Sequence, residues 1–241
     1  MSNYIDIHNH CLPGLDDGAR TIKESIEMLR IASEEGIKEI IVTPHYKHSR
    51  YLKSPEDVAI IKKEIEEELA KERIDITLHL GNELFYHIDI INELEQKKVN
   101  TLADSQYVLV EFYPNESLST IKKGLYEFLT YGYYPILAHV ERYEEIVEDL
   151  NEVRELLNMG AYLQINASTL VGLHGRKNKR FVKKLLKEEL VQFVGTDAHS
   201  ARSRAPLLSE CAAYIAKKYG DWYAIELLIE NPQKILLNQS I

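Results

Sequence analysis

Histidines and carboxylates gather near the start of the chain, within residues 6–18. His8 and His10 are separated by one residue and directly follow an apolar run. On a strand the side chains of residues two positions apart face the same side, and the Pro-Gly and Asp-Asp-Gly sequences after them predict a bend. A bend lets both imidazoles bind one metal ion, with oxygen ligands from Asp16 or Asp17. A His-x-His pair alone is weak evidence, so this interpretation depends on the rest of the chain.

The same residue types recur where each predicted strand ends. His45 follows the predicted strand over 37–43, Glu83 follows the strand over 74–80, and Glu111 ends the strand over 107–112. His139 follows the strand over 135–138, and Asn166 follows the strand over 161–165. Asp197 and His199 both follow the strand over 190–194. In a barrel of parallel strands the carboxyl ends converge on one face, so these side chains would share a single site. All seven predicted strands end in a group able to bind a metal or an anion, which unrelated core histidines do not explain.

The elements that must position these residues alternate along the chain. The first predicted helix begins at the capping box Thr21–Glu24 and ends at Gly36, and a second begins at Ser54 and Pro55. Further helices are predicted over 87–97, 118–131, 151–159 and 177–189, and from about residues 206, 222 and 232. Strands separated by helices predict parallel βαβ units, and seven such units predict a seven-stranded relative of the (β/α) barrel.

The composition predicts one globular α/β domain over residues 1–241. The chain is 45% hydrophobic and 28% charged, which is ordinary for such a domain. Its formal net charge of −9 argues against nucleic acid as a partner. Cys11 and Cys211 do not form a disulfide framework. The chain opens without a signal-peptide pattern and has no apolar run of about eighteen residues, so we expect no membrane insertion and a cytoplasmic location.

The candidate ligands indicate a cluster of metal ions. Histidine with Asp and Glu, without cysteine, suits Zn, Mn, Fe or Mg. The set is too large for one ion, whereas two or three ions sharing a carboxylate would suit an in-line displacement at phosphorus. Arg142 follows His139 closely and Arg204 follows His199, so two guanidinium groups arise from the same loops as the ligands. These arginines are candidates to bind phosphate oxygens.

These residues also carry a family resemblance. The stretches concerned are Asp6-Ile7-His8-Asn9-His10, Leu12-Pro13-Gly14-Leu15-Asp16-Asp17-Gly18, Thr43-Pro44-His45, Gly81-Asn82-Glu83, His139-Val140-Glu141-Arg142-Tyr143, Gln164-Ile165-Asn166-Ala167 and Gly195-Thr196-Asp197-Ala198-His199. The chain resembles the polymerase and histidinol phosphatase (PHP) superfamily. Within it, the chain is similar to the manganese-dependent protein-tyrosine phosphatases of bacterial capsule and exopolysaccharide gene clusters.

The resemblance implies a distorted seven-stranded TIM-like barrel that binds three divalent metal ions. Manganese is the ion implied first, with iron, zinc or magnesium as alternatives. The implied ligand sets are His8, His10, Glu83 and Asp197; Glu83, Glu111 and His139; and Asp17, His45 and His199, with Arg142 and Arg204 binding phosphate. Asp17 matches the family ligand better than Asp16. The implied substrate is the phosphotyrosine tail of a cognate bacterial tyrosine kinase that controls polysaccharide export, and an oligomer is left open.

The expected mechanism is attack on phosphorus by a metal-activated hydroxide. A phenolate leaving group needs less help from a general acid than an alkoxide does, which favours aryl phosphates, and His48 is a candidate acid. Tyr46, Tyr51, Tyr86 and Tyr113, in loops after strands, are candidates to line a cleft for an aromatic ring, although partly buried packing is the more common role for each.

Several alternative functions are left open by the residues alone. A PHP-type phosphoesterase could instead act on histidinol phosphate or a nucleotide, and a non-catalytic metal-binding regulatory subunit is a further alternative. Cysteine-dependent phosphatase chemistry is disfavoured, because it requires an arginine six residues after the nucleophile. Cys11 is followed at that distance by Asp17, and Cys211 by Lys217.

Overall fold

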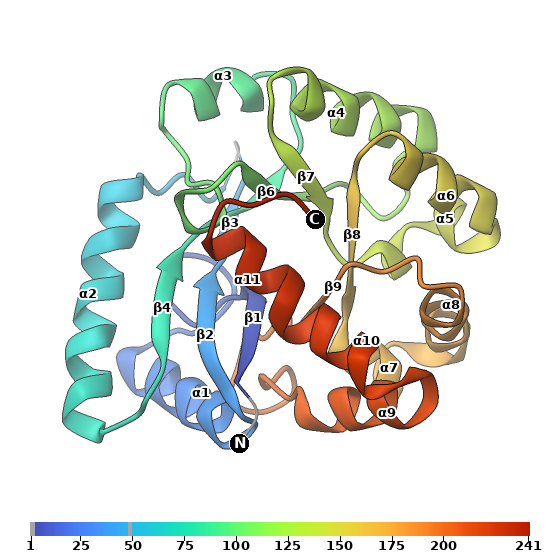
Figure 1. The fold of residues 1–241 in the computed structure, drawn as a ribbon. Helices are drawn as coiled ribbons and strands as arrows, with labels where there is room; N and C mark the ends of the chain where they lie inside the picture. Colours follow the sequence, from blue (N-terminus) through green and yellow to red (C-terminus); the bar gives the residue numbers. More distant parts are fainter. Residues whose placement is uncertain (1–2, 48–49) are drawn as a thin grey trace.

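The strands of the protein form a parallel barrel that is interrupted on one side (Figure 1). The computed structural model describes residues 3–47 and 50–241. The strands are β1 (Tyr4–Asn9), β2 (Ile37–Val42), β3 (His45–Tyr46), β4 (Thr77–Leu80), β5 (Glu83–Phe85), β6 (Tyr107–Glu111), β7 (Tyr134–Leu137), β8 (Tyr162–Asn166) and β9 (Phe193–Gly195). One sheet has the order β1-β2-β4 and the other β3-β5-β6-β7-β8-β9, with parallel neighbours throughout. This confirms the predicted α/β barrel class.

The larger helices pack around the outside of the strands (Figure 1). They are α1 (Ile22–Glu34), α2 (Pro55–Glu72), α3 (Ile90–Glu95), α4 (Leu118–Thr130), α5 (Glu144–Glu148), α6 (Leu150–Asn158), α7 (Ala167–Val171), α8 (Gly175–Lys187), α9 (Ser209–Tyr219), α10 (Asp221–Ile225) and α11 (Asn231–Leu236), with short turns η1 (Leu102–Asp104), η2 (Val140–Arg142) and η3 (Glu226–Glu230). The predicted caps are confirmed, because Thr21 and Ser54 accept backbone hydrogen bonds at the starts of α1 and α2. Among the described residues, no helix is both long and apolar enough to cross a membrane.

Two of the predicted strands are interrupted near their carboxyl ends. Pro44 follows β2 and has no backbone N–H to continue the ladder. Its carbonyl instead accepts hydrogen bonds from the Asn82 side chain at 2.9 Å and the Glu83 backbone at 3.2 Å. The chain therefore steps from β2 into β3 and from β4 into β5, which belong to the second sheet. The predicted strand count of seven thus becomes nine among the described residues.

The carboxyl ends of β1 and β9 meet through a single parallel bridge between Asn9 and Ala198. Backbone hydrogen bonds extend this contact, from His10 N–H to the Ala198 carbonyl and from Asp197 N–H to the His8 carbonyl, both at 2.9 Å. The first strand is thereby fixed beside the last one. Residues that are far apart in the sequence are placed together at this end of the barrel.

The barrel interior is apolar, and its amino end is covered by the C-terminal segment. Ile7, Ile41, Leu109, Ile136, Ala138 and Phe193 form the buried interior cluster, together with Ile235 of α11. The hydroxyl of Tyr107, at the start of β6, donates a hydrogen bond to the Gln239 carbonyl at 2.8 Å. The opposite, carboxyl end of the strands is the one that carries the polar residues.

Candidate metal centre

Four imidazoles surround the carboxylate of Glu83, which is fully buried. Its Oε2 atom lies 3.2 Å from His8 Nε2 and 3.3 Å from His10 Nε2. The same oxygen lies 2.9 Å from His45 Nδ1, and Oε1 lies 2.9 Å from His139 Nε2. Burial alone would raise the pKa of Glu83, but His8 and His45 outweigh burial and hold it well below its ordinary value. Glu83 therefore contributes a negative charge at the centre of the cluster.

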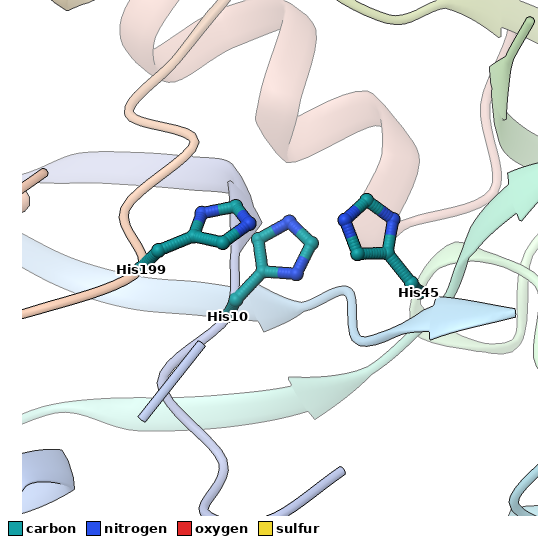
Figure 2. A group of neighbouring side chains, drawn as sticks. All are labelled: His10, His45 and His199. Atoms are coloured by element: carbon teal, nitrogen blue, oxygen red, sulfur yellow. The ribbon is translucent and has the colours of Figure 1, made fainter. Parts of the chain in front are cut away.

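Three of the histidines lie close together, and His10 contacts both His199 and His45 (Figure 2). The ring centroid of His10 lies 3.8 Å from that of His199 and 4.6 Å from that of His45. His10 Nε2 also lies 3.1 Å from His8 Nε2. Where Nδ1 of each neutral ring donates to its oxygen neighbour, both Nε2 atoms carry lone pairs that face each other.

The predicted metal ligands lie close together, and we divide them into the three sets that the family resemblance implies. We call them the first, second and third ligand groups: His8, His10, Glu83 and Asp197; Glu83, Glu111 and His139; and Asp17, His45 and His199. Within the first ligand group, Asp197 Oδ1 lies 3.5 Å from His8 Nε2. Glu83 belongs to two groups because its two oxygens face different histidines.

The donor atoms within the second and third ligand groups are also close to one another. Glu111 Oε1 lies 3.4 Å from His139 Nε2. Asp17 Oδ1 lies 3.4 Å from His45 Nε2 and 3.6 Å from His199 Nε2. The structure therefore brings together every residue that the sequence analysis assigned as a ligand, and their binding of metal stays a prediction.

The backbone at two of these residues is in the left-handed region. His139 has φ of 36° and Asp197 has φ of 51°. Non-glycine residues rarely adopt such angles, which cost of order 1–3 kcal/mol and cluster at functional sites. At both positions the turn directs a side chain that follows the end of a strand toward Glu83 or its histidines.

Hydrogen bonds to the far side of each ring fix how the histidines point. His8 Nδ1 lies 3.1 Å from Gln164 Oε1, and His10 Nδ1 lies 2.7 Å from Asp16 Oδ2. Asp16 also accepts a hydrogen bond from the His45 backbone N–H at 2.8 Å. Partners of this kind orient the rings of histidine ligands and leave Nε2 free for the metal. The sequence analysis left Asp16 open and did not identify Gln164 as an orienting residue.

Both predicted phosphate-binding arginines form ion pairs with Asp197. Arg142 forms an ion pair with Asp197 Oδ2, and Arg204 lies 2.8 Å from Oδ1. Asn166, which the sequence analysis placed among the possible metal or anion ligands, donates to Asp197 Oδ2 at 2.8 Å. Burial raises the pKa of Asp197, but His8 and the two arginines outweigh it and keep that pKa well below the ordinary range.

Two buried carboxylates outside the predicted set tie the site together. Asp6 accepts hydrogen bonds from the Thr196 backbone at 3.0 Å and hydroxyl at 2.6 Å, which joins β1 to the segment after β9. Glu141 accepts from the Asn166 backbone at 2.9 Å and the Thr169 hydroxyl at 2.7 Å, which joins η2 to α7. An acidic residue within an apolar stretch is rarely buried without polar partners. The position of such a residue was the signal available in the sequence.

The donor set fits divalent metal ions on two observations. Glu83 Oε2 is buried and forms no hydrogen bond of regular geometry among the described residues, although three imidazole nitrogens lie 2.9–3.3 Å from it. Leaving such atoms unpaired is costly unless a cation or another partner satisfies them. The ligand atoms are imidazole nitrogens and carboxylate oxygens, which are the donors that Zn, Mn and Fe accept.

The two cysteines of the chain are unsuited to nucleophilic attack. Both Cys11 and Cys211 are buried, and burial raises the pKa of Cys211 to about 12. Reactive cysteines instead have lowered pKa values and partial exposure. The candidate general acid His48 lies outside the described residues.

Comparison with known proteins agrees with this geometry. A family model described as capsular polysaccharide synthesis, CpsB/CapC, matches residues 4–237. The tyrosine-protein phosphatase CpsB of Streptococcus pneumoniae is 36% identical, covering 98% of this chain and 100% of the relative. The tyrosine-protein phosphatase YwqE of Bacillus subtilis is 34% identical, covering 98% of this chain and 93% of the relative.

A solved structure is similar over nearly the same range. It comes from work on YwqE from Bacillus subtilis and CpsB from Streptococcus pneumoniae, described there as metal-dependent tyrosine phosphatases. It superimposes with a TM-score of 0.92 at 34% identity, covering 98% of this chain and 96% of the other. The family match and these relatives extend over almost the whole chain. The chain therefore belongs to the CpsB/CapC family of capsular polysaccharide synthesis proteins.

Proposed function

We propose that this protein is a metal-dependent protein-tyrosine phosphatase, a phosphoric monoester hydrolase that uses no cysteine nucleophile. The observation that carries the proposal is the buried Glu83 carboxylate, surrounded by four imidazoles and lying beside the cluster of Asp197 with Arg142 and Arg204. Its relatives named as tyrosine phosphatases cover almost the whole chain and support the same activity.

Three divalent ions, one for each ligand group, are the proposed cofactors, with manganese as the first candidate. Three sets of donor atoms, each within 4.8 Å of one another, support more than one ion: His10, His45 and His199; His8, His10 and Asp197; and His45, Glu83 and Glu111. The absence of thiolate ligands in the ligand groups agrees with manganese or iron. When bound, such ions supply Lewis acidity and make hydroxide available from water near neutral pH.

The side chains of this chain then have distinct roles toward the phosphate. Arg142 and Arg204 are partly exposed, and each can donate two parallel N–H groups to phosphate oxygens. In this role they would neutralise the charge that builds up on the oxygens as the ester bond breaks. Gln164 and Asp16 hold the rings of His8 and His10 in the orientation that faces the ions.

The leaving group explains why a tyrosyl ester is the favoured substrate. Tyrosine has a pKa near 10, so its phenolate departs with less proton transfer than a serine or sugar alkoxide needs. The proposed substrate is the phosphotyrosine tail of a bacterial tyrosine kinase that regulates capsular or exopolysaccharide synthesis. The family description and the names of the relatives support this assignment, and we propose that the protein acts in the cytoplasm.

Phosphate release from four substrates tests the proposal. A phosphotyrosyl peptide, a phosphoseryl peptide, histidinol phosphate and a nucleotide are each incubated with the protein and Mn²⁺, and again with EDTA. We expect Mn²⁺-dependent release that is confined to the phosphotyrosyl peptide. Preference for histidinol phosphate or the nucleotide would keep the metal centre but refute the tyrosine phosphatase assignment. If no substrate is hydrolysed, a non-catalytic metal-binding subunit becomes the better hypothesis.

A further inference from the structure

A groove of about 290 Å³ begins at the candidate metal centre and extends beyond it. It is lined by Asp17, His45, Lys47, Arg50, Tyr51, Phe85, Glu111, Phe112, Tyr113 and Pro114. Three of these residues are predicted metal ligands, so one end of the groove is continuous with the site. The remaining lining consists of four aromatic residues, Pro114 and two cations.

Part of the groove lining is a pair of stacked aromatic rings with a cation beside them. The ring of Tyr51 stacks on that of His45, with centroids 6.0 Å apart and planes inclined by 17°. The guanidinium of Arg50 lies 5.0 Å from the centroid of Tyr51. Arg50 and the predicted metal ligand His45 therefore lie against the same aromatic ring.

A second cation of the groove lining lies against two aromatic rings. Lys47 Nζ lies 3.9 Å from the centroid of Phe85 and 4.6 Å from that of Tyr113. The two rings meet edge to face, with centroids 4.5 Å apart. Cation–π contacts of this kind restrict a long side chain that would otherwise be mobile. The ammonium of Lys47 is therefore held at the groove before any substrate arrives.

In the part of the chain that the structure describes, neither cation is neutralised by a carboxylate. Among the described residues, no carboxylate lies within the 4.0 Å limit of an ion pair with Lys47 or Arg50. Elsewhere on this acidic chain, Lys62, Lys71 and Lys122 each have a glutamate at 2.6 Å. Unpaired cations at the rim of a site attract anionic groups from a partner and set its orientation.

We propose that Lys47 and Arg50 bind acidic side chains that flank the phosphotyrosine of the substrate, so that the groove selects acidic phosphotyrosyl segments. This inference rests on the proposed phosphatase function and adds the local sequence of its substrate. In an extended peptide, residues two positions apart point to the same side and are separated by about 6.6 Å. The ring of Tyr51 lies at a similar distance, 6.0 Å, from that of His45, and Arg50 lies against Tyr51. We therefore place glutamate two residues before and two residues after the phosphotyrosine in the test peptide.

Three phosphotyrosyl peptides test the inference. They are identical except that the residues two before and two after the phosphotyrosine are both Glu, both Ala or both Lys. With Mn²⁺ present, we expect kcat/KM to rise about two- to fivefold for each glutamate relative to alanine, and to fall for lysine. The change should lie mainly in KM. It should shrink as NaCl is raised from about 50 to about 500 mM, because salt screens exposed charges.

Substitutions then assign the effect to residues. Lys47→Gln should lower the preference for the Glu peptide over the Ala peptide by about two- to fivefold. Phe85→Leu keeps the charge of Lys47 but removes one ring beneath it, so its preference should be intermediate. Lys53→Gln is the matched control, because Lys53 is exposed and lines a different cavity. This control should keep both the preference and the activity of the unaltered protein.

The possible outcomes separate this inference from the function on which it rests. Equal Mn²⁺-dependent hydrolysis of all three peptides overturns the acidic preference and leaves the phosphatase assignment intact. A preference that Lys47→Gln and Lys53→Gln lose equally overturns the role of Lys47. Hydrolysis of histidinol phosphate with none of the three peptides cleaved overturns the phosphatase assignment and this inference together.

Discussion

Asp16 Oδ2 lies 2.7 Å from His10 Nδ1, on the side of the ring that faces away from Glu83. The Asp16 side chain is fully buried and also accepts the backbone N–H of His45. Its neighbour Asp17 is half exposed and directs Oδ1 toward the Nε2 atoms of His45 and His199. Two adjacent aspartates therefore have different surroundings, and only Asp17 faces the third ligand group.

Substituting each aspartate in turn distinguishes a ligand from an orienting residue. We expect Asp17→Asn to lose one of the three proposed ions and most of its activity. Asp16→Asn should retain all the ions but bind them about 10–100-fold more weakly, because it no longer fixes the His10 ring. Metal content after dialysis and Mn²⁺ titration of phosphatase activity measure the difference. If Asp16→Asn alone lost an ion outright, the assignment of Asp17 as the ligand would be wrong.

Removing a phosphate-binding arginine should impair catalysis more than folding. Arg142→Met is expected to lower kcat/KM for a phosphotyrosyl peptide by about 10²–10³-fold, the usual effect of losing a donor that stabilises developing charge. Arg154→Met is the matched control, because Arg154 makes only exposed contacts on α6, including an ion pair with Glu188 at 3.3 Å. An equal loss of activity in both variants would point to a general effect on the fold instead.

Metal removal should lower thermal stability as well as activity. Ions that bind only the folded protein stabilise it by about 2.7 kcal/mol at a hundred times their Kd. For a chain of this size that corresponds to roughly 5–10 °C in Tm. We therefore expect EDTA to lower Tm by this amount and to abolish phosphotyrosyl hydrolysis, with both restored by excess Mn²⁺. Unchanged Tm on chelation and on Mn²⁺ addition would argue against ions bound in the buried ligand groups.

Most of the candidate ligands could be predicted because they lie at or soon after the end of an apolar run, whereas Asp17 was chosen from the family resemblance. In a parallel barrel, the position after a strand is enough to place a side chain on the carboxyl face, so His45 and His139 were recognisable without any contact information. The short strands β3 and β5 were not, because two or three residues are too few to show a period of two. Their existence depends on Asn82 and Pro44, which lie 38 residues apart.

The orienting residues were hidden from the sequence for the same physical reason. Asp6 acts through Thr196, 190 residues away, and Gln164 through His8, 156 residues away. Nothing local identifies such partners, since a polar residue on a strand has the same appearance whether it is exposed or buried. The organisation of residues 1–241 as one domain stays a prediction.

A carboxylate far from the metal centre gives a test of stability against pH. Glu35, after the end of α1, accepts backbone hydrogen bonds from Leu208 at 2.9 Å and Ser209 at 2.7 Å, at the start of α9. Burial tends to raise the pKa of Glu35, but the hydrogen bonds from Ser209 and Leu208 outweigh it and lower the pKa. A lowered pKa in the folded state means that the ionised form stabilises the fold.

The sign of the effect follows from that shift. The stabilisation is complete above the unfolded-state pKa of about 4.3 and is lost as the pH falls through the lower folded-state pKa. Glu35→Gln should therefore lower the free energy of unfolding by about 1 kcal/mol at neutral pH, a value that allows for solvent screening of a partly exposed group. Glu34→Gln removes the same charge from an exposed neighbour and should change stability little. Urea unfolding at pH 7 and in steps below pH 4 measures both variants, and a Glu35→Gln deficit that grew as the pH fell would contradict the assignment.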